Sequence, residues 1–223
     1  MPGDTMDALR EEVVSCRTCP RLVAWREAVA ARPRPAFAGE TYWGRPVPGF
    51  GDPLARLVVV GLAPAAHGGN RTGRIFTGDR SGDWLWAALW RAGWANQPDS
   101  VSRHDELRAT GAWVTAVVRC APPGNRPTPE ERDHCLPYLA RELALLPNSR
   151  VLLALGGFAY EACARMSAVR PRPPFRHGLE VPIAGGRWIV CSYHPSQQNT
   201  FTGRLTTEML DHALARAGQL ATS

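Results

Sequence analysis

Four cysteines lie in two close pairs, a pattern that suits a metal site. Cys16 and Cys19 form a C-x-x-C, while Cys120 and Cys135 lie much later, on either side of a short strand-to-helix connection. Four thiolates can hold a zinc ion or an iron–sulfur cluster, and the spacing does not choose between them. The other two cysteines fall in an expected helix and a buried strand, where cysteine packs as a small apolar side chain.

Polar residues with other possible chemistry follow the expected strands, in loops rich in glycine and proline. These loops cover residues 63–73, 119–126, 156–157 and 193–200. In open parallel α/β sheets, ligands bind outside the carboxyl ends of the strands. The four loops should therefore share one rim of the sheet, and that rim is the expected site.

The elements that must position these loops can be read from the hydrophobic pattern. Continuous apolar runs indicate strands buried on both faces, at Leu57–Leu62, Trp113–Val118, Val151–Leu155 and Trp188–Ser192. Helices are expected at Met6–Val14, Asp83–Ala92, Pro129–Leu146, Gly157–Arg165 and Leu205–Arg216. Thr128, Pro129 and Glu131 give the third of these helices a capping box, and Pro137 is a possible break within it.

Strands that alternate with helices predict an α/β fold. We expect a three-layer α/β/α sandwich around a mostly parallel, four-stranded sheet, with residues 1–223 forming a single domain. The proline- and glycine-rich stretch 32–53 is expected to be a long irregular segment, which in a compact domain is usually functional or mobile.

The charge composition points toward phosphate-bearing partners. All 26 basic residues are arginine, the net charge is +6, and lysine is absent. Guanidinium groups suit nucleic acids, although a genome biased against lysine codons explains the composition equally well. Without lysine, chemistry through a lysine Schiff base is excluded.

Several protein classes are disfavoured by the sequence. No apolar run is long enough to span a membrane, and an acidic start replaces the basic one of a secretory signal, so a cytoplasmic location is expected. The loop after the first strand has neither the G-K-[ST] of a Walker A motif nor G-x-G-x-x-G. Hydrolysis of nucleoside triphosphates and NAD chemistry are therefore not expected.

Four motifs in order give a specific resemblance: Gly61–Ala65 (GLAPA), Gly73–Asp79 (GRIFTGD), Arg119–Arg126 (RCAPPGNR) and His194–Ser196 (HPS). With the four cysteines, they make nearly the whole chain resemble family 5 of the uracil-DNA glycosylase superfamily, the "type b" enzymes of thermophilic bacteria and archaea. The resemblance implies a monomer with a structural 4Fe–4S cluster on Cys16, Cys19, Cys120 and Cys135. It also implies excision of uracil from damaged DNA without strand cleavage.

Excision of a base makes defined demands on side chains. The base must be flipped out of the helix, and charge then develops on the sugar and on the leaving pyrimidine. His194 is the expected hydrogen-bond donor to the base, with a core or turn histidine as the alternative. Asp79 is the expected carboxylate near the sugar, with a helix N-cap as the alternative.

The flipped base should also be held by neighbouring residues. Phe76 is expected to stack on it, unless it is an ordinary core residue, and Gly61 and Ala63 are expected to line its site. Asn125 has an amide that could read a pyrimidine edge, although Pro-Pro-Gly-Asn is also a common turn.

Two positions depart from related families of the superfamily. Those families carry an acidic residue at the position of Leu62 or Ala63, and an asparagine at the position that matches Ala116. Because these positions are apolar here, Asp79 is the nearest acidic substitute. We expect looser base selectivity, with uracil and some other deaminated or damaged bases excised.

DNA contacts are expected on both sides of this site. Gln197, Phe201 and their neighbours offer polar groups and an apolar wedge. Tyr42 and Trp43, in the irregular segment, are further candidates for nucleic-acid contact, whereas helical spacing makes most of the tryptophans between 84 and 94 core residues. The residues expected to contact DNA are His67, Asn70, Arg71, Arg74, Gln198, Asn199 and Arg204.

Two other functions stay open from the sequence. The apolar residues in the first motif allow an iron–sulfur nucleic-acid-binding protein that has this fold without catalysis. A zinc-dependent hydrolase is a weaker alternative, since four thiolates close a zinc site and leave no open position.

Overall fold

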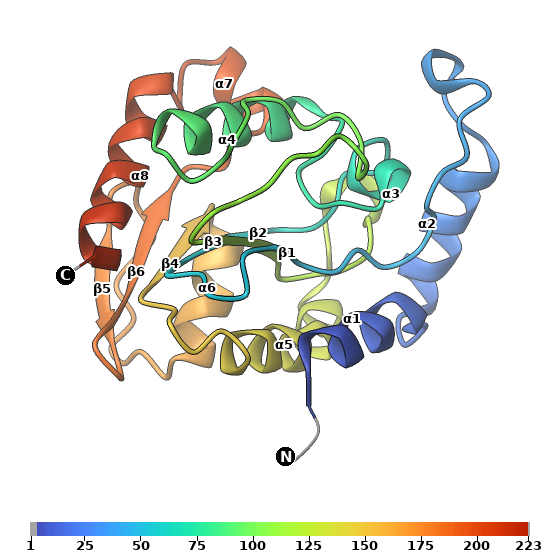
Figure 1. Ribbon diagram of the computed structural model, residues 1–223. Coiled ribbons are helices and arrows are strands. Elements are labelled where there is room, and N and C mark those ends of the chain that lie inside the picture. Colours follow the sequence, from blue (N-terminus) through green and yellow to red (C-terminus); the bar gives the residue numbers. More distant parts are fainter. Residues whose placement is uncertain (1–3, 223) are drawn as a thin grey trace.

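The computed structural model describes residues 4–222, and its centre is a six-stranded, mostly parallel sheet (Figure 1). Four parallel strands form the middle of the sheet in the order β3 (Ala112–Ala116), β2 (Leu57–Gly61), β4 (Val151–Leu155) and β6 (Arg187–Ser192). Every residue of the first three is buried. The four strands predicted from apolar runs are thus confirmed, within one or two residues at their ends.

The predicted number of strands is wrong, because two short antiparallel strands extend the sheet at its edges. Phe50–Gly51 (β1) pairs with β3, and Glu180–Ile183 (β5) pairs with β6. β1 has only two residues and lies in the segment that was expected to be irregular. β5 contains Pro182, which is tolerated because an edge strand needs only one of its sides for pairing.

The helices agree with the predicted ones and add several that the sequence pattern did not indicate. The predicted helices are α1 (Met6–Ser15), α4 (Arg80–Arg91), α5 (Pro129–Ala144), α6 (Gly157–Met166) and α8 (Thr207–Thr222). The additional ones are α2 (Pro20–Ala31), α3 (Gly69–Thr72) and α7 (Gln197–Phe201), with 3₁₀ turns at Pro35–Phe37 and Pro123–Asn125.

Local sequence explains where α5 begins and why it continues. The Thr128 hydroxyl accepts a hydrogen bond from the Glu131 amide, and the Glu131 carboxylate accepts one from the Thr128 amide, as the capping box predicts. The possible break at Pro137 does not occur, and α5 runs through this exposed position. The helix therefore carries Cys135 in its second turn, as expected.

Helices cover both faces of the sheet (Figure 1). α4 and α8 pack together on one face, over a core that includes Val59, Trp86 and Leu214. α5 and α6, with α1 outside them, cover the other face over a core that includes Val58 and Leu139. No helix within residues 4–222 has the length and apolar character needed to cross a membrane.

Candidate functional site

Two aromatic rings meet where β2 and β6 end, at the rim that the sequence predicted. The ring centroids of Phe76 and His194 lie 5.8 Å apart, with an angle of 31° between the planes. A Cβ built on Gly61 would lie 2.6 Å from the Phe76 ring, so only glycine allows the ring to rest on the end of β2. The Trp86 indole donates a 2.8 Å hydrogen bond to the Phe76 carbonyl oxygen, which fixes this residue at its positive φ of 50°.

Asp79 lies in the same loop and is the N-cap of α4, the alternative that the sequence left open. Its Oδ1 accepts a 3.0 Å hydrogen bond from the Gly82 amide. A Cβ built on Gly68 would overlap Oδ2 of Asp79, so glycine at 68 makes room for the carboxylate. The hydrogen bond from Gly82 is made to Oδ1, while Oδ2 lies against Gly68.

The loop after β6 holds His194 in place through its backbone. The Asn199 side-chain amide donates a 2.9 Å hydrogen bond to the His194 carbonyl oxygen. The Ser196 hydroxyl caps α7 by accepting a hydrogen bond from the backbone amide of Asn199. A Cβ on Gly156 would lie 3.4 Å from the His194 Cβ, so the end of β4 packs closely against this residue.

Burial sets the protonation of these groups. It lowers the pKa of His194 to about 4, so the imidazole is neutral at pH 7. Burial also raises the pKa of Asp79, against the opposing effect of hydrogen bonds from the Gly82 and Ser81 amides. We call Gly61, Phe76, Asp79 and His194 the strand-end site, because the Phe76 ring lies against Gly61 and beside His194, and Asp79 follows Phe76 by three residues at the start of α4.

The other residues expected to bind the substrate are placed differently. Ala63 follows β2 and packs on the side of the sheet that carries the cysteines. Ala116 pairs with Gly61 in the sheet register, so the position that matches the asparagine of related families does lie beside the site. Asn125 is exposed, in a turn with a φ of 55°, as the turn alternative predicted. Its role in reading a base stays a prediction.

The four cysteines expected to bind a metal lie at the end of α1, at the start of α2, in the loop after β3 and in α5. Cys16 ends α1 and Cys19 caps α2, whereas Cys120 and Cys135 are buried on the facing segment. Burial, together with the neighbouring Cys135, Glu131 and Cys16, raises the pKa of Cys19 to about 11. We call these four residues the cysteine site. Among the residues described, no group of three or more Cys, His, Asp or Glu side chains is arranged to hold a metal ion.

A buried arginine lies against the cysteine site. The Arg26 side chain is 2% exposed, and its Nη1 donates a 2.9 Å hydrogen bond to Sγ of Cys120. Its Nη2 donates to the Cys16 carbonyl oxygen at 3.2 Å, while its Nε has no hydrogen-bond partner in the described structure. The nearest carboxylate, that of Glu27, lies 3.8 Å away and is 43% exposed. The guanidinium charge is therefore buried with little compensation.

The sequence did not single out Arg26, but it carries a signal that could have. Pro20 begins α2 directly after Cys19, and Arg26 follows Cys19 by two helical turns. A helix starting at the C-x-x-C therefore places Arg26 on the same side as Cys19. Because the chain has 26 arginines, Arg26 can be singled out from the sequence only if a helix is predicted to begin at Pro20.

Four residues expected to contact DNA have partners within the protein. Asn70 is fully buried and donates to the Arg26 carbonyl oxygen, and Arg74 is buried in an ion pair with Asp105. Arg71 pairs with Glu40, and the His67 ring bonds to the Tyr42 hydroxyl. These side chains build the loop between β2 and α4, and a direct contact with DNA stays a prediction for each of them.

The remaining expected contacts lie on the other side of the strand-end site. Gln198 is exposed on α7, and the guanidinium of exposed Arg204 lies 4.7 Å from the Tyr193 ring centre. The sequence missed Arg80, whose guanidinium lies 4.6 Å from the centre of the Phe201 ring. Phe201 is 68% exposed.

Comparison of the sequence with known proteins places this chain in one superfamily. The family model described as "Uracil DNA glycosylase superfamily" matches residues 48–218. A type-5 uracil-DNA glycosylase of Thermus thermophilus is 54% identical over 216 residues, which cover 96% of this chain and 98% of that protein. Type-5 uracil-DNA glycosylases of Mycobacterium tuberculosis and Pyrobaculum aerophilum are 56% and 46% identical, over 92% and 97% of this chain and 78% and 93% of those proteins.

Proposed function

The chain belongs to the uracil-DNA glycosylase superfamily, and we propose that it excises uracil from DNA by hydrolysing the N-glycosidic bond, which leaves an abasic site. The observation that supports this proposal is the Phe76 ring lying beside His194 at the carboxyl ends of β2 and β6, with Asp79 three residues after Phe76 at the start of α4. The substrate is uracil-containing DNA, on which the protein acts as a monomer in the cytoplasm.

The reaction needs help at two points, because charge separates as the bond breaks. Negative charge grows on the leaving pyrimidine, and neutral His194 donates a hydrogen bond to the base oxygen that carries it. Because the pKa of His194 is about 4, the imidazole is neutral at pH 7 and carries one N–H, and this N–H is the donor to the base oxygen.

Positive charge grows on the deoxyribose at the same time. The carboxylate of Asp79, held at the start of α4, stabilises that charge and orients the attacking water. Phe76 offers a face for the flipped base above Gly61, where the end of β2 has no side chain to block it.

The products follow from residues that the chain lacks. Because no lysine is present, the usual lyase route through a Schiff base is closed, and excision ends at the abasic site. Ala116 lies beside Gly61 in place of an amide that would select uracil. The site therefore also accepts other deaminated or damaged bases.

We propose that Cys16, Cys19, Cys120 and Cys135 hold a structural 4Fe–4S cluster. Four thiolates give such a cluster a net negative charge, and buried Arg26 supplies a cation whose nearest carboxylate, that of Glu27, lies 3.8 Å away and is 43% exposed. The cluster ties the N-terminal helices to β3 and α5, and the strand-end chemistry needs no electron transfer. The resemblance to family 5 favours this cluster over a zinc ion.

DNA lies across the strand-end site, with α7 entering beside the flipped base. Exposed Phe201 is suited to fill the gap left in the base stack, while Arg80, Gln198 and Arg204 contact the neighbouring backbone. Asn199 acts by holding the His194 backbone.

Excision is tested with a labelled duplex that has one uracil opposite guanine. We expect strand cleavage only after alkali, which breaks abasic sites, and release of free uracil. No release from uracil or from a panel of deaminated bases, by protein that binds the duplex tightly, would instead indicate a nucleic-acid-binding protein without catalysis. Cleavage without alkali would contradict the absence of a lyase step.

A further inference from the structure

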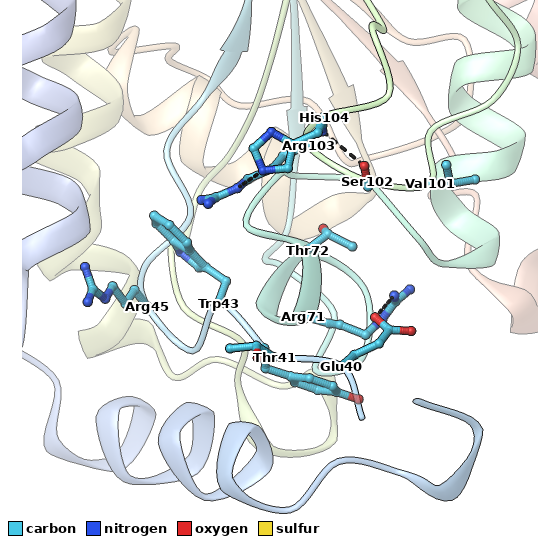
Figure 2. A pocket seen from close by; sticks show the side chains of 11 residues that line it. Glu40, Thr41, Trp43, Arg45, Arg71, Thr72, Val101, Ser102, Arg103 and His104 are labelled. Carbon is cyan, nitrogen blue, oxygen red and sulfur yellow. Dashed lines mark hydrogen bonds and ion pairs between the residues drawn. The ribbon is translucent and has the colours of Figure 1, made fainter. Parts of the chain in front are cut away.

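A groove of about 460 Å³ lies beside α3, outside the strand-end site (Figure 2). One wall is the segment 40–45, which includes Trp43 and Arg45, and the other is the loop 101–104, which includes Arg103 and His104. Arg71 and Thr72 of α3 lie between the two walls. None of these wall residues has a role in the excision chemistry derived above.

The groove carries positive charge that the protein does not neutralise. The guanidinium groups of Arg103 and Arg45 lie 4.7 Å and 5.7 Å from the Trp43 ring centre. Both arginines are exposed, and neither forms an ion pair within residues 4–222. The carboxylate of Glu40 is already paired with Arg71 at 2.6 Å. Two guanidinium groups thus lie against one indole, and Nε of Arg103 donates a 3.0 Å hydrogen bond to Nε2 of His104, which orients this guanidinium in the groove.

Trp43 is itself fixed, so it can position these cations. Its indole nitrogen donates a 3.0 Å hydrogen bond to the Pro46 carbonyl oxygen, and its backbone amide donates to the Arg71 carbonyl oxygen at 2.9 Å. A Cβ on Gly73 would lie 2.9 Å from the indole ring, so α3 ends directly against it. Trp43 is thus held against α3, and α3 belongs to the same β2–α4 loop as Phe76 and Asp79.

Both walls are fastened to the loop that carries Asp79. Arg71 Nη2 donates a 3.0 Å hydrogen bond to the carbonyl oxygen of Gly78, the residue before Asp79. The Gly78 amide donates to the Ser100 carbonyl oxygen at 2.8 Å, just before the loop 101–104. Arg71 and the residue before the loop 101–104 are thus both hydrogen-bonded to Gly78, which precedes Asp79.

We propose that this groove binds the phosphodiester backbone of the DNA strand beside the excised base, through Arg45 and Arg103 held on Trp43. The inference rests on the proposed glycosylase function and extends it to a second contact area. Arg80 on Phe201 and Arg204 on Tyr193 repeat the same stacked arrangement at the other end of the strand-end site. Stacked guanidinium groups thus lie on both sides of Asp79, as expected along the path of a polyanion.

The test compares two pairs of exposed arginines. Arg45→Gln with Arg103→Gln removes the groove charges. Arg56→Gln with Arg150→Gln removes the same charge beside the amino ends of β2 and β4, at the opposite edge of the sheet. Binding of an undamaged fluorescent DNA duplex is measured by anisotropy at salt concentrations from about 50 to about 200 mM, where the affinity depends strongly on the number of phosphate contacts. Thermal melting of both variants checks that they fold.

For the groove pair we expect about 10-fold weaker binding and a salt slope smaller by about two, one for each lost phosphate contact. The control pair should change neither quantity appreciably. With a uracil-containing duplex, the groove pair should raise the enzyme concentration needed for half-maximal single-turnover excision, and leave the maximal rate within about twofold.

Several outcomes would overturn the proposal. Equal losses in the two pairs would show a general effect of net charge, and an unchanged salt slope in the groove pair would show that no phosphate is bound there. Stronger binding of a single-stranded RNA of the same sequence, lost in the groove pair, would assign the groove to another nucleic acid. A failure of wild-type excision, with the groove pair still selectively weakened, would reject the glycosylase function but not the groove.

Discussion

The cysteine site and the strand-end site both contain buried ionisable side chains, but burial affects the charge of these side chains differently in the two sites. At the cysteine site, burial encloses a full positive charge, because Arg26 is 2% exposed and its nearest carboxylate is 3.8 Å away. At the strand-end site, burial removes charge, because it lowers the pKa of His194 to about 4 and raises that of Asp79.

The difference follows from the residue types. Arginine stays protonated at any accessible pH, so a buried guanidinium must find negative charge in its surroundings. Histidine can change protonation instead, so burial leaves His194 as a neutral donor, while hydrogen bonds from the Gly82 and Ser81 amides favour the charged form of Asp79 against its burial. One region is therefore suited to bind an anionic group, and the other to stabilise charges that appear only during a reaction.

The largest effect should come from removing a cysteine of the cysteine site. In Cys135→Ser we expect loss of the bound iron and of the visible absorption of the proposed iron–sulfur cluster. The melting temperature should fall strongly, since a bound metal group contributes several kcal/mol to folding. Cys163→Ser is the matched control, because Cys163 is also buried but lies in α6, away from the site. If both variants keep equal iron, the four ligands are wrongly assigned.

A loss of about 10²- to 10³-fold in the single-turnover excision rate is expected for His194→Ala, because one oriented donor to a developing charge contributes this much. Binding of the abasic product should stay within a few-fold of wild type. His212→Ala, at an exposed position of α8, should leave the rate unchanged. An equal fall in rate and in product binding would indicate that His194 holds DNA and does not stabilise the leaving base.

Asp79 has two roles, and two substitutions separate them. Asp79→Asn keeps an oxygen for the Gly82 amide but removes the charge, so we expect about 10- to 10²-fold slower excision at an unchanged melting temperature. Asp79→Ala should lose the same activity and also about 1 kcal/mol of stability, as for other lost N-caps. If Asp79→Asn is as active as wild type, the carboxylate is only a cap.

The smallest effect is expected at Arg26, where the charge can be removed and much of the volume kept. Arg26→Met should fold and still excise uracil, but should lose iron faster when a chelator is added, because the anionic site loses its buried cation. Arg91→Met is a control, since Arg91 of α4 pairs with Asp211 of α8 on the opposite face of the sheet. Equal rates of iron loss in wild type and Arg26→Met would remove the contrast between the two regions.

The central strands were predictable because they are buried on both faces, and Val58 and Val60 face one core while Val59 faces the other. The edge strands β1 and β5 were not predictable, since two residues give no pattern and Pro182 argues against a strand. Edge strands of this kind depend on a neighbouring strand more than on their own sequence.

The strand-end site was predictable as a set of loops but not as contacts. His194 and Phe76 follow strands, and the topology brings their loops to one rim. The need for Gly68 beside Asp79 could not be seen, because it is a contact between residues of one irregular loop. Asn70 and Arg74 looked like surface residues, yet both are buried in hydrogen bonds that only the folded loop creates.

The protonation state of His194 tests the central claim most directly. The imidazole resonances are followed by NMR from pH 3 to pH 8, with His194→Asn used to assign the signal among the six histidines. We predict a pKa near 4, so the ring is neutral at pH 7 and gains its proton only in strong acid. A pKa at or above about 6.5, the value of an exposed histidine, would mean that burial does not prepare a neutral donor and would contradict the account.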